Sequence, residues 1–254
     1  MGENGRVGSM DRSTTRWTRP ALIECRVCPS RETADLCNVE PGLFSEFEAI
    51  RHTLVYRPGQ FLFYEGHAVL GLYILCSGRV KLTRTTARGQ CRLVGIVDPG
   101  QLIEKHTFQD GAVHEVTCEA IEPSQVCVLD RTKYLAFLER HGELAVRLVK
   151  LLSRTMGSSL EESDQLAFAS ARERIAGLLL ELANRYGEPA EQGIRIALQL
   201  RREELAQMAA MTTETAVRIL TALHTKKIIE IHGREITICQ ADRLARAARR
   251  LSSP

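Results

Sequence analysis

The sequence lacks any long hydrophobic run. No uninterrupted apolar stretch approaches the roughly 18 residues that a bilayer-spanning helix needs. The N-terminal segment MGENGRVGSMDRSTTRW also has no apolar centre of the kind found in secretion signals. These absences argue against a membrane protein and predict a cytoplasmic location. With 254 residues, of which 44% are hydrophobic, the chain is long enough to form more than one compact unit with its own core.

A catalytic constellation is also missing. No part of the sequence supplies a nucleophile, a base and an oxyanion site together, so we expect no enzymatic activity, and a thiol oxidoreductase is the less favoured alternative. Eight cysteines are present. They would predict a disulfide framework in a small secreted chain, but this chain has no export signal and three of them crowd one end. We therefore expect free thiols and metal ligands.

Two short helix patterns followed by a hairpin signal occupy residues 200–238. The first pattern spans Glu203–Ala209, and Thr212 then offers its hydroxyl as an N-cap for a second, amphipathic helix. Beyond that helix, residues 228–231 and 235–239 alternate in hydrophobicity around a His-Gly turn. This order predicts a winged helix-turn-helix, whose second helix enters the major groove of DNA.

On the second helix, Glu214 and Arg218 lie one turn apart on the polar face. An arginine can bind a guanine edge through two hydrogen bonds and a glutamate can accept one from cytosine, so the pair suits a G·C step. The alternative is a solvated i,i+4 ion pair, worth only about 0.2 to 0.5 kcal/mol. Residues 170–254 carry 14 Lys and Arg against 10 Asp and Glu. This surplus favours DNA binding because it neutralises phosphates.

Short β-rich runs separated by glycines fill residues 54–130 and predict an antiparallel barrel or roll. Residues 131–140 follow as a short helix, and a longer helix begins at Gly142. Apolar residues on the longer helix form a narrow seam, which favours a partner helix over packing on the chain's own domain because the rest of the helix is polar. The seam consists of Val149, Leu152, Met156 and Leu160.

In this order, the segments PGQFLFYEG, LYILCSGRVKL, PGQLI, ARERIAGLLLELA and TETAVR resemble the CRP/FNR family. This is the family of the cyclic-AMP receptor protein (CRP) and the fumarate and nitrate reductase regulator (FNR). The resemblance runs from Cys25 onward and implies an α+β fold: an N-terminal antiparallel β-roll like that of cyclic-nucleotide-binding domains, a long dimerisation helix and a C-terminal winged helix-turn-helix. It also implies a homodimer on a two-fold symmetric operator, with RNA polymerase as a further partner. The expected domains are a cysteine-bearing arm (1–40), the roll sensor (41–130), the dimerisation helix (131–169) and the DNA-binding domain (170–254).

The resemblance also refines the expected DNA contacts. Thr213 stands where CRP carries an arginine, so we expect TTGAT-like half-sites about one helical turn apart. Ala210 replaces the usual turn glycine and must either adopt a left-handed backbone or reshape the turn. Arg201, at the start of the first helix, is expected to face phosphate. The DNA-contacting set is Arg201, Thr212, Thr213, Glu214, Val217 and Arg218.

Cyclic-nucleotide binders of the family hold the ribose and the phosphate with a Gly-Glu pair and an Arg-Ser pair. The corresponding stretch here, GQLIEKHTFQDGAVHEVTCEA, contains Glu104 but no Arg-Ser, and its one Lys or Arg is Lys105. A buried phosphate without an arginine would be poorly compensated, so we expect no cyclic-nucleotide control. Gly89-Gln90 also departs from the Gly-Asp pair that the FNR activator presents to polymerase.

Cys25, Cys28 and Cys37 place three thiols within thirteen residues, and the two-residue gap lets two sulfurs face one metal centre. The residues alone do not choose between Cys118 and Cys127 as a fourth ligand. The resemblance to FNR selects Cys127, because CEAIEPSQVC matches the segment that ends in its distant cluster ligand. Carried over, Cys25, Cys28, Cys37 and Cys127 would hold a [4Fe–4S] cluster that responds to oxygen or nitric oxide.

Other sensors remain as alternatives. Zinc bound by four cysteines would use the same residues, and a reactive dithiol would need only Cys25 and Cys28, although these lack a strand-to-helix context. Haem-binding relatives use the part of the roll that contains His106, but a lone histidine is usually not a ligand. The remaining cysteines lie in strand-like runs and are expected to be small core or half-buried residues: Cys76, Cys91, Cys118 and Cys239.

Overall fold

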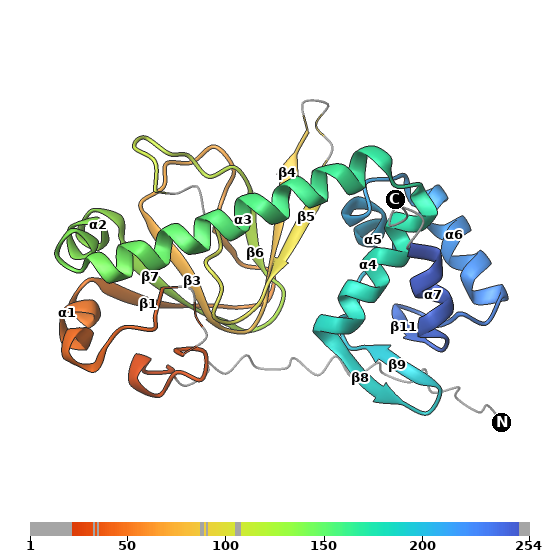
Figure 1. The fold of residues 1–254 in the computed structure, drawn as a ribbon, viewed down its shortest axis with the longest axis horizontal. Helices are drawn as coiled ribbons and strands as arrows, with labels where there is room; N and C mark the ends of the chain where they lie inside the picture. The colour runs from red at the N-terminus through yellow and green to blue at the C-terminus, as the bar shows by residue number, and fades with distance from the viewer. Residues whose placement is uncertain are drawn as a thin grey trace, which may run out of the picture.

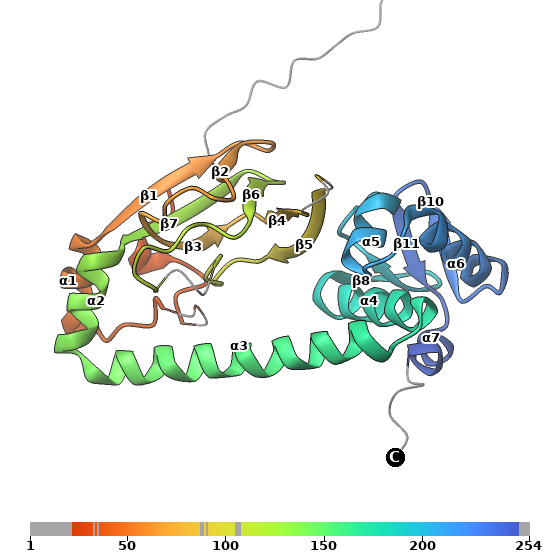
Figure 2. The same ribbon diagram turned by 90° about the horizontal axis from the view of Figure 1, so that it is seen from above.

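One long helix joins two lobes in the computed structural model (Figure 1). Figure 2 shows the helix running along the strand-rich lobe and ending at the second, mainly helical lobe. The structure describes residues 22–248 except 33, 35, 87, 88, 90 and 105–107, and for residues 158–167 it describes the backbone alone. Lys105, His106 and Gln90 therefore lie outside the described residues, as does the N-terminal arm up to residue 21. None of the described helices is long and apolar enough to cross a bilayer.

The strand-rich lobe is an antiparallel roll made of two sheets, with the strand orders β1-β7-β3 and β2-β6-β4-β5. The central strand β7 is buried along most of its length, whereas β6 alternates between half-buried and buried residues. This arrangement confirms the predicted roll. Its strands are β1 (Arg51–Tyr56), β2 (Phe61–Phe63), β3 (Gly71–Ser77), β4 (Val80–Thr85), β5 (Cys91–Val97), β6 (Thr117–Ala120) and β7 (Ser124–Asp130).

The turn between β3 and β4 requires a glycine. Gly78 has a φ of 79°, and a Cβ there would lie 2.4 Å from the carbonyl oxygen of Pro123. Both the left-handed backbone and the close approach exclude a side chain. The turn brings Arg79 beside the β6–β7 connection, where its guanidinium pairs with Glu122 at 2.5 Å.

The segment before the first strand packs into the core of the roll. Phe47 is fully buried and its ring centroid lies 6.2 Å from that of Phe137. Ile23 exchanges two 2.7 Å hydrogen bonds with the side chain of Gln125 in β7. The described part of the cysteine-bearing arm therefore belongs to the roll. The helices here are η1 (Cys25–Val27), η2 (Pro41–Leu43), α1 (Phe44–Ala49) and α2 (Arg131–Arg140).

The second lobe is built around α4, whose apolar face is fully buried. Ser170 caps this helix with a capping box completed by Glu173. The sheet has the order β10-β11-β9-β8. Its β8–β9 hairpin was not predicted, because the segment GEPAEQGIRI is mostly exposed and shows no alternation of apolar and polar residues. The elements are α4 (Ala171–Tyr186), β8 (Gly187–Ala190), β9 (Gly193–Ile196), α5 (Arg202–Met208), α6 (Thr213–Thr225), β10 (Ile229–His232), β11 (Glu235–Ile238) and α7 (Ala241–Ala248).

The long helix α3 (Gly142–Phe168) carries the predicted seam. Val149 and Met156 are 64% and 71% exposed, so nothing in the described chain covers them. Leu152 differs from the prediction, because it is half-buried and packs on the roll core of its own chain. The side chain of Leu160 lies outside the described residues.

Candidate nucleic-acid interface and sensor site

The helix α6 has the properties expected of a recognition helix. The Thr212 hydroxyl accepts a hydrogen bond from the Thr215 amide at 3.3 Å and so caps the helix as predicted. Its apolar face is buried against the lobe, which fixes the helix and leaves the opposite face free. Thr213, Glu214, Val217 and Arg218 are all exposed on that free face.

The turn before α6 is held by an arginine that sequence analysis did not single out. Ala210 has a φ of 51°, so it takes the left-handed conformation, at a cost of roughly 1 to 2 kcal/mol. Arg174 donates hydrogen bonds to the carbonyl oxygens of Ala209 at 2.8 Å and Ala210 at 3.3 Å. These bonds to two turn carbonyls offset the strain and fix α6 relative to α4. The ARERIAG segment contained this residue, but nothing local indicated its partners.

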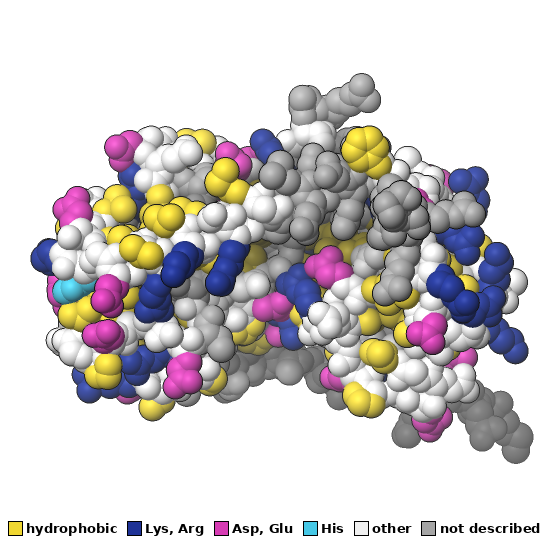
Figure 3. All heavy atoms as spheres, in the orientation of Figure 1, with side chains coloured by type: hydrophobic (Ala, Val, Ile, Leu, Met, Phe, Trp, Pro, Cys, Tyr) yellow, Lys and Arg dark blue, Asp and Glu magenta, His cyan; other side chains and the backbone are white. Residues whose placement is uncertain are grey.

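Cations gather around the recognition helix. Figure 3 shows Lys and Arg side chains at the end of the molecule where α6 lies. Arg201 is the N-cap residue of α5 and its side chain is 57% exposed. Arg202 donates to the carbonyl oxygen of Gly233 at 2.7 Å and so ties α5 to the predicted wing, the β10–β11 hairpin. These contacts place Arg201 and Arg202 of the α5 segment beside the wing, while Arg218 is exposed on α6.

Three of the four predicted cluster ligands lie in the same core of the roll, and the fourth is next to them in the chain. Cys25, Cys37 and Cys127 are 6%, 7% and 0% exposed and belong to one core. Cys28 is half-buried at the end of η1, where its backbone N–H donates to the carbonyl oxygen of Cys25 at 3.3 Å. Cys118 is buried in a different core, between the two sheets. The structure thus groups Cys127, not Cys118, with the N-terminal thiols.

A fifth thiol joins this group. The Cys127 thiol is the hydrogen-bond donor toward the sulfurs of Cys25 and Cys76. The bond to Cys127 lowers the pKa of Cys25 to about 7, with a smaller contribution from the charge of Arg51. Cys76 is half-buried against the core, as expected from the sequence, but its contact with Cys127 was not foreseen because it depends on the pairing of β3 with β7.

Arg51 supplies positive charge beside the thiols. Its side chain is 15% exposed and donates to the Thr53 hydroxyl at 2.7 Å, while Thr53 lies opposite Cys127 in the β1–β7 register. The Arg51 Nε is buried and has no hydrogen-bond partner. Within the described residues, no group of three or more His, Cys, Asp or Glu side chains is arranged to hold a metal ion.

A buried pair occupies the stretch that corresponds to the nucleotide site. Glu104 and His114 are 6% and 2% exposed, and the Glu104 carboxylate binds the His114 Nδ1. The other carboxylate oxygen accepts a 3.0 Å hydrogen bond from the Glu115 amide. The His114 ring stacks on Phe63 with a centroid distance of 3.7 Å. Glu104 is therefore already engaged inside the roll.

Comparisons with known proteins decide the family. Residues 173–247 match the Crp-like helix-turn-helix domain, and residues 53–141 match the cyclic nucleotide-binding domain. The "Cyclic AMP receptor protein" of Thermus thermophilus is 32% identical over 187 residues, which cover 74% of this chain and 83% of that protein. The chain belongs to the CRP/FNR family.

Two further comparisons agree with this assignment. The "Transcriptional activator protein Anr" of Pseudomonas protegens is 26% identical over 198 residues, which cover 75% of this chain and 78% of that protein. The solved structure of FixK2 from Bradyrhizobium japonicum has a TM-score of 0.66 and 22% identity, and covers 78% of this chain and 97% of that chain. At this identity the likeness concerns the fold alone, and it confirms the predicted α+β architecture.

As a CRP/FNR protein, the chain is a DNA-binding transcription regulator. The Pseudomonas protegens relative is a transcriptional activator, in agreement with a regulatory role. Family membership also implies a dimer, for which the uncovered Val149 and Met156 on α3 provide an apolar surface.

Proposed function

We propose that this CRP/FNR regulator senses oxygen or nitric oxide through a [4Fe–4S] cluster. The observation that carries the proposal is the grouping of Cys25, Cys28, Cys37 and Cys127, contributed by two segments far apart in sequence. We place the protein in the cytoplasm, where thiols stay reduced and DNA is accessible.

The donor set fits such a cluster. Four cysteine thiolates are the usual ligands of [4Fe–4S] centres, and their negative charge needs compensation when it is buried. Arg51 provides a largely buried guanidinium, whose Nε–H has no acceptor and is available to donate to a cluster sulfur. Each cysteine of a [4Fe–4S] cluster binds a different iron atom, so the four sulfurs need not converge on one point as they would around a single metal ion. Binding of the cluster then requires only that the thiol side chains rearrange around it. When bound, the cluster supplies an iron centre whose oxidation state and stability depend on oxygen.

The cysteine segment is placed to influence the dimerisation helix. Leu148 of α3 belongs to the same core as Cys25 and Cys37. Arg147 donates a hydrogen bond to the carbonyl oxygen of Asn38, next to Cys37. A change in the cysteine segment therefore shifts groups that contact α3 directly. We propose that loss of the cluster reaches the DNA-binding domain through these contacts.

Cyclic-AMP control is the second candidate, because one relative is named a cyclic-AMP receptor protein. The buried Glu104–His114 pair opposes it. A ribose would have to displace His114 from Glu104, and the described roll offers no arginine at this position to meet a phosphate.

Anaerobic purification of the wild-type protein tests the proposal. We expect a brown protein with four iron atoms and four acid-labile sulfides per chain, whose visible absorbance fades in air. A colourless protein that contains zinc would establish the zinc alternative instead, and a red protein with haem absorbance would establish haem. Calorimetric titration with cyclic AMP serves as the parallel test of the second candidate, and we expect no binding heat.

We further propose that Arg218 contacts a guanine and Glu214 the opposing cytosine of a TTGAT-like half-site. Replacing Arg218 by alanine should weaken operator binding by about 1 to 3 kcal/mol and relax selectivity at one base pair. Arg201→Ala should instead weaken binding to all sequences alike and flatten the salt dependence. Fluorescence anisotropy on specific and random duplexes distinguishes the two. Equal losses on both duplexes for Arg218→Ala would show that this residue does not read bases.

A further inference from the structure

The DNA-binding lobe is docked on the roll of its own chain at the strand β5. Leu93 and Ile96 of β5 are buried in the same core as α4. Polar contacts cross the same boundary: the Leu93 amide donates to the side-chain oxygen of Gln207 at 2.8 Å, and Arg92 donates to the Gln207 carbonyl at 3.1 Å. The two lobes therefore meet through a specific interface and not through α3 alone.

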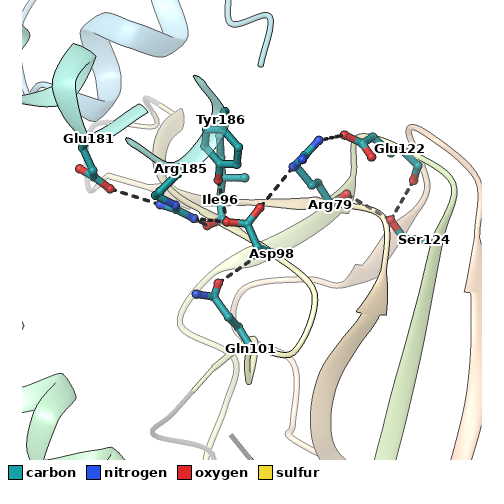
Figure 4. Close-up of polar contacts among 9 residues, drawn as sticks. All are labelled: Arg79, Ile96, Asp98, Gln101, Glu122, Ser124, Glu181, Arg185 and Tyr186. Atoms are coloured by element: carbon teal, nitrogen blue, oxygen red, sulfur yellow. Dashed lines mark hydrogen bonds and ion pairs between the residues drawn. The ribbon is translucent and has the colours of Figure 1, made fainter. Parts of the chain in front are cut away.

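Asp98, directly after β5, is the centre of the polar part of this interface (Figure 4). One carboxylate oxygen accepts from Arg185 at 2.6 Å and from the Tyr186 hydroxyl at 2.9 Å. The other accepts from Arg79 at 3.2 Å. Arg79 and Arg185 also lie over the Tyr186 ring, at 5.1 and 5.0 Å from its centroid. Arg79 holds the carboxylate from the roll side, while Arg185 and Tyr186 reach it from α4.

The position of these contacts on α4 lets them fix the orientation of the second lobe. Two non-helical residues, Ala169 and Ser170, link α3 to α4. Because the helix is interrupted there, helix continuity does not fix the orientation of the second lobe. Arg185 and Tyr186 end the 16-residue helix α4, about 24 Å from that link at 1.5 Å per residue. A contact at the C-terminal end of α4 restricts rotation of the second lobe about the Ala169-Ser170 link more strongly than a contact close to that link would.

We propose that Asp98 is an intramolecular latch that holds the DNA-binding lobe in its DNA-competent orientation. In the latched arrangement Glu214 and Arg218 remain exposed on α6, so docking on the roll leaves the base-reading face free. A dimer must present two such faces in register to bind a two-fold operator. Opening the latch therefore lowers operator affinity without changing the recognition surface.

The variant Asp98→Asn tests the latch, with Glu181→Gln as the matched control. Glu181 is an exposed partner of Arg185 within α4, at 3.2 Å, and lies on the same helix and not across the contact between lobes. The DNA probes are the duplex that the wild-type protein enriches from a random-sequence library and a scrambled duplex of equal length. We expect Asp98→Asn to bind the enriched duplex about tenfold more weakly, within the usual range of coupling between sites. Its affinity for the scrambled duplex and the behaviour of Glu181→Gln should be unchanged.

Hydrogen exchange at the Leu93 amide gives an independent readout of docking, since its acceptor Gln207 belongs to the other lobe. We expect faster exchange there in Asp98→Asn and in the milder Tyr186→Phe, which removes one hydroxyl and keeps the ring. Unchanged exchange in both variants would overturn the latch. Equal losses on both duplexes, or tighter binding to the enriched one, would overturn the assignment of the latched form as DNA-competent.

Discussion

Cys127→Ser should abolish iron loading and remove the visible absorbance of the anaerobic protein. Cys127 is fully buried at the centre of the thiol group, and a serine hydroxyl does not ionise at neutral pH to replace the thiolate. Iron analysis and absorbance spectra of the purified variant measure the effect. Cys118→Ser is the matched control, because Cys118 is equally buried but belongs to the core between the two sheets. It should keep its full iron content.

The fifth thiol, Cys76, adds a further control to the measurement of iron content. We expect Cys76→Ser and Cys239→Ser to retain the cluster. A Cys127→Ser protein with full iron content would contradict the assignment, and the structure indicates which residue would then replace it. Cys76 hydrogen-bonds Cys127, so the double variant Cys76→Ser with Cys127→Ser would lose the iron in that case.

Placing charges on the exposed seam of α3 should convert the dimer to a monomer. Val149 and Met156 are the uncovered members of the seam, and an unpaired carboxylate buried at an interface costs several kcal/mol, doubled by two-fold symmetry. The variant Val149→Asp with Met156→Asp should elute as a monomer in size-exclusion chromatography with light scattering. Its operator affinity should fall by at least about tenfold, because only one half-site is then read.

Leu152 sets the control for this experiment. It packs on its own roll but is only half-buried, so Leu152→Ala should lower the free energy of unfolding by less than the roughly 2 to 5 kcal/mol that truncating a buried leucine costs. Its effect on dimerisation should be smaller than that of the seam variant. A seam variant that stays dimeric would refute the role of α3. A monomer with unchanged operator affinity would refute the coupling between dimerisation and DNA binding.

Local sequence determined the elements and their order. The Thr212 cap, the amphipathic pattern of α6 and the glycine-punctuated strands depend on neighbours a few residues away, so they could be read directly. For Ala210 the sequence left two outcomes, a left-handed backbone or a reshaped turn, and the structure shows the left-handed one. Together these features were sufficient to predict the roll, the long helix and the winged helix-turn-helix, which the structure and the comparisons confirm.

Only the tertiary structure decided which distant residues meet. Cys118 and Cys127 lie on successive strands, and alternation shows that each has a buried face but not whether that face meets the opposite sheet or the N-terminal segment. Asp98 and Arg185 are 87 residues apart, and neither carries a local signal of the other. Leu152 matches the seam by spacing, yet it is half-buried because the roll lies beside that turn of α3. Spacing along the chain fixes the direction of a side chain relative to its own element, whereas its partner depends on how the elements pack.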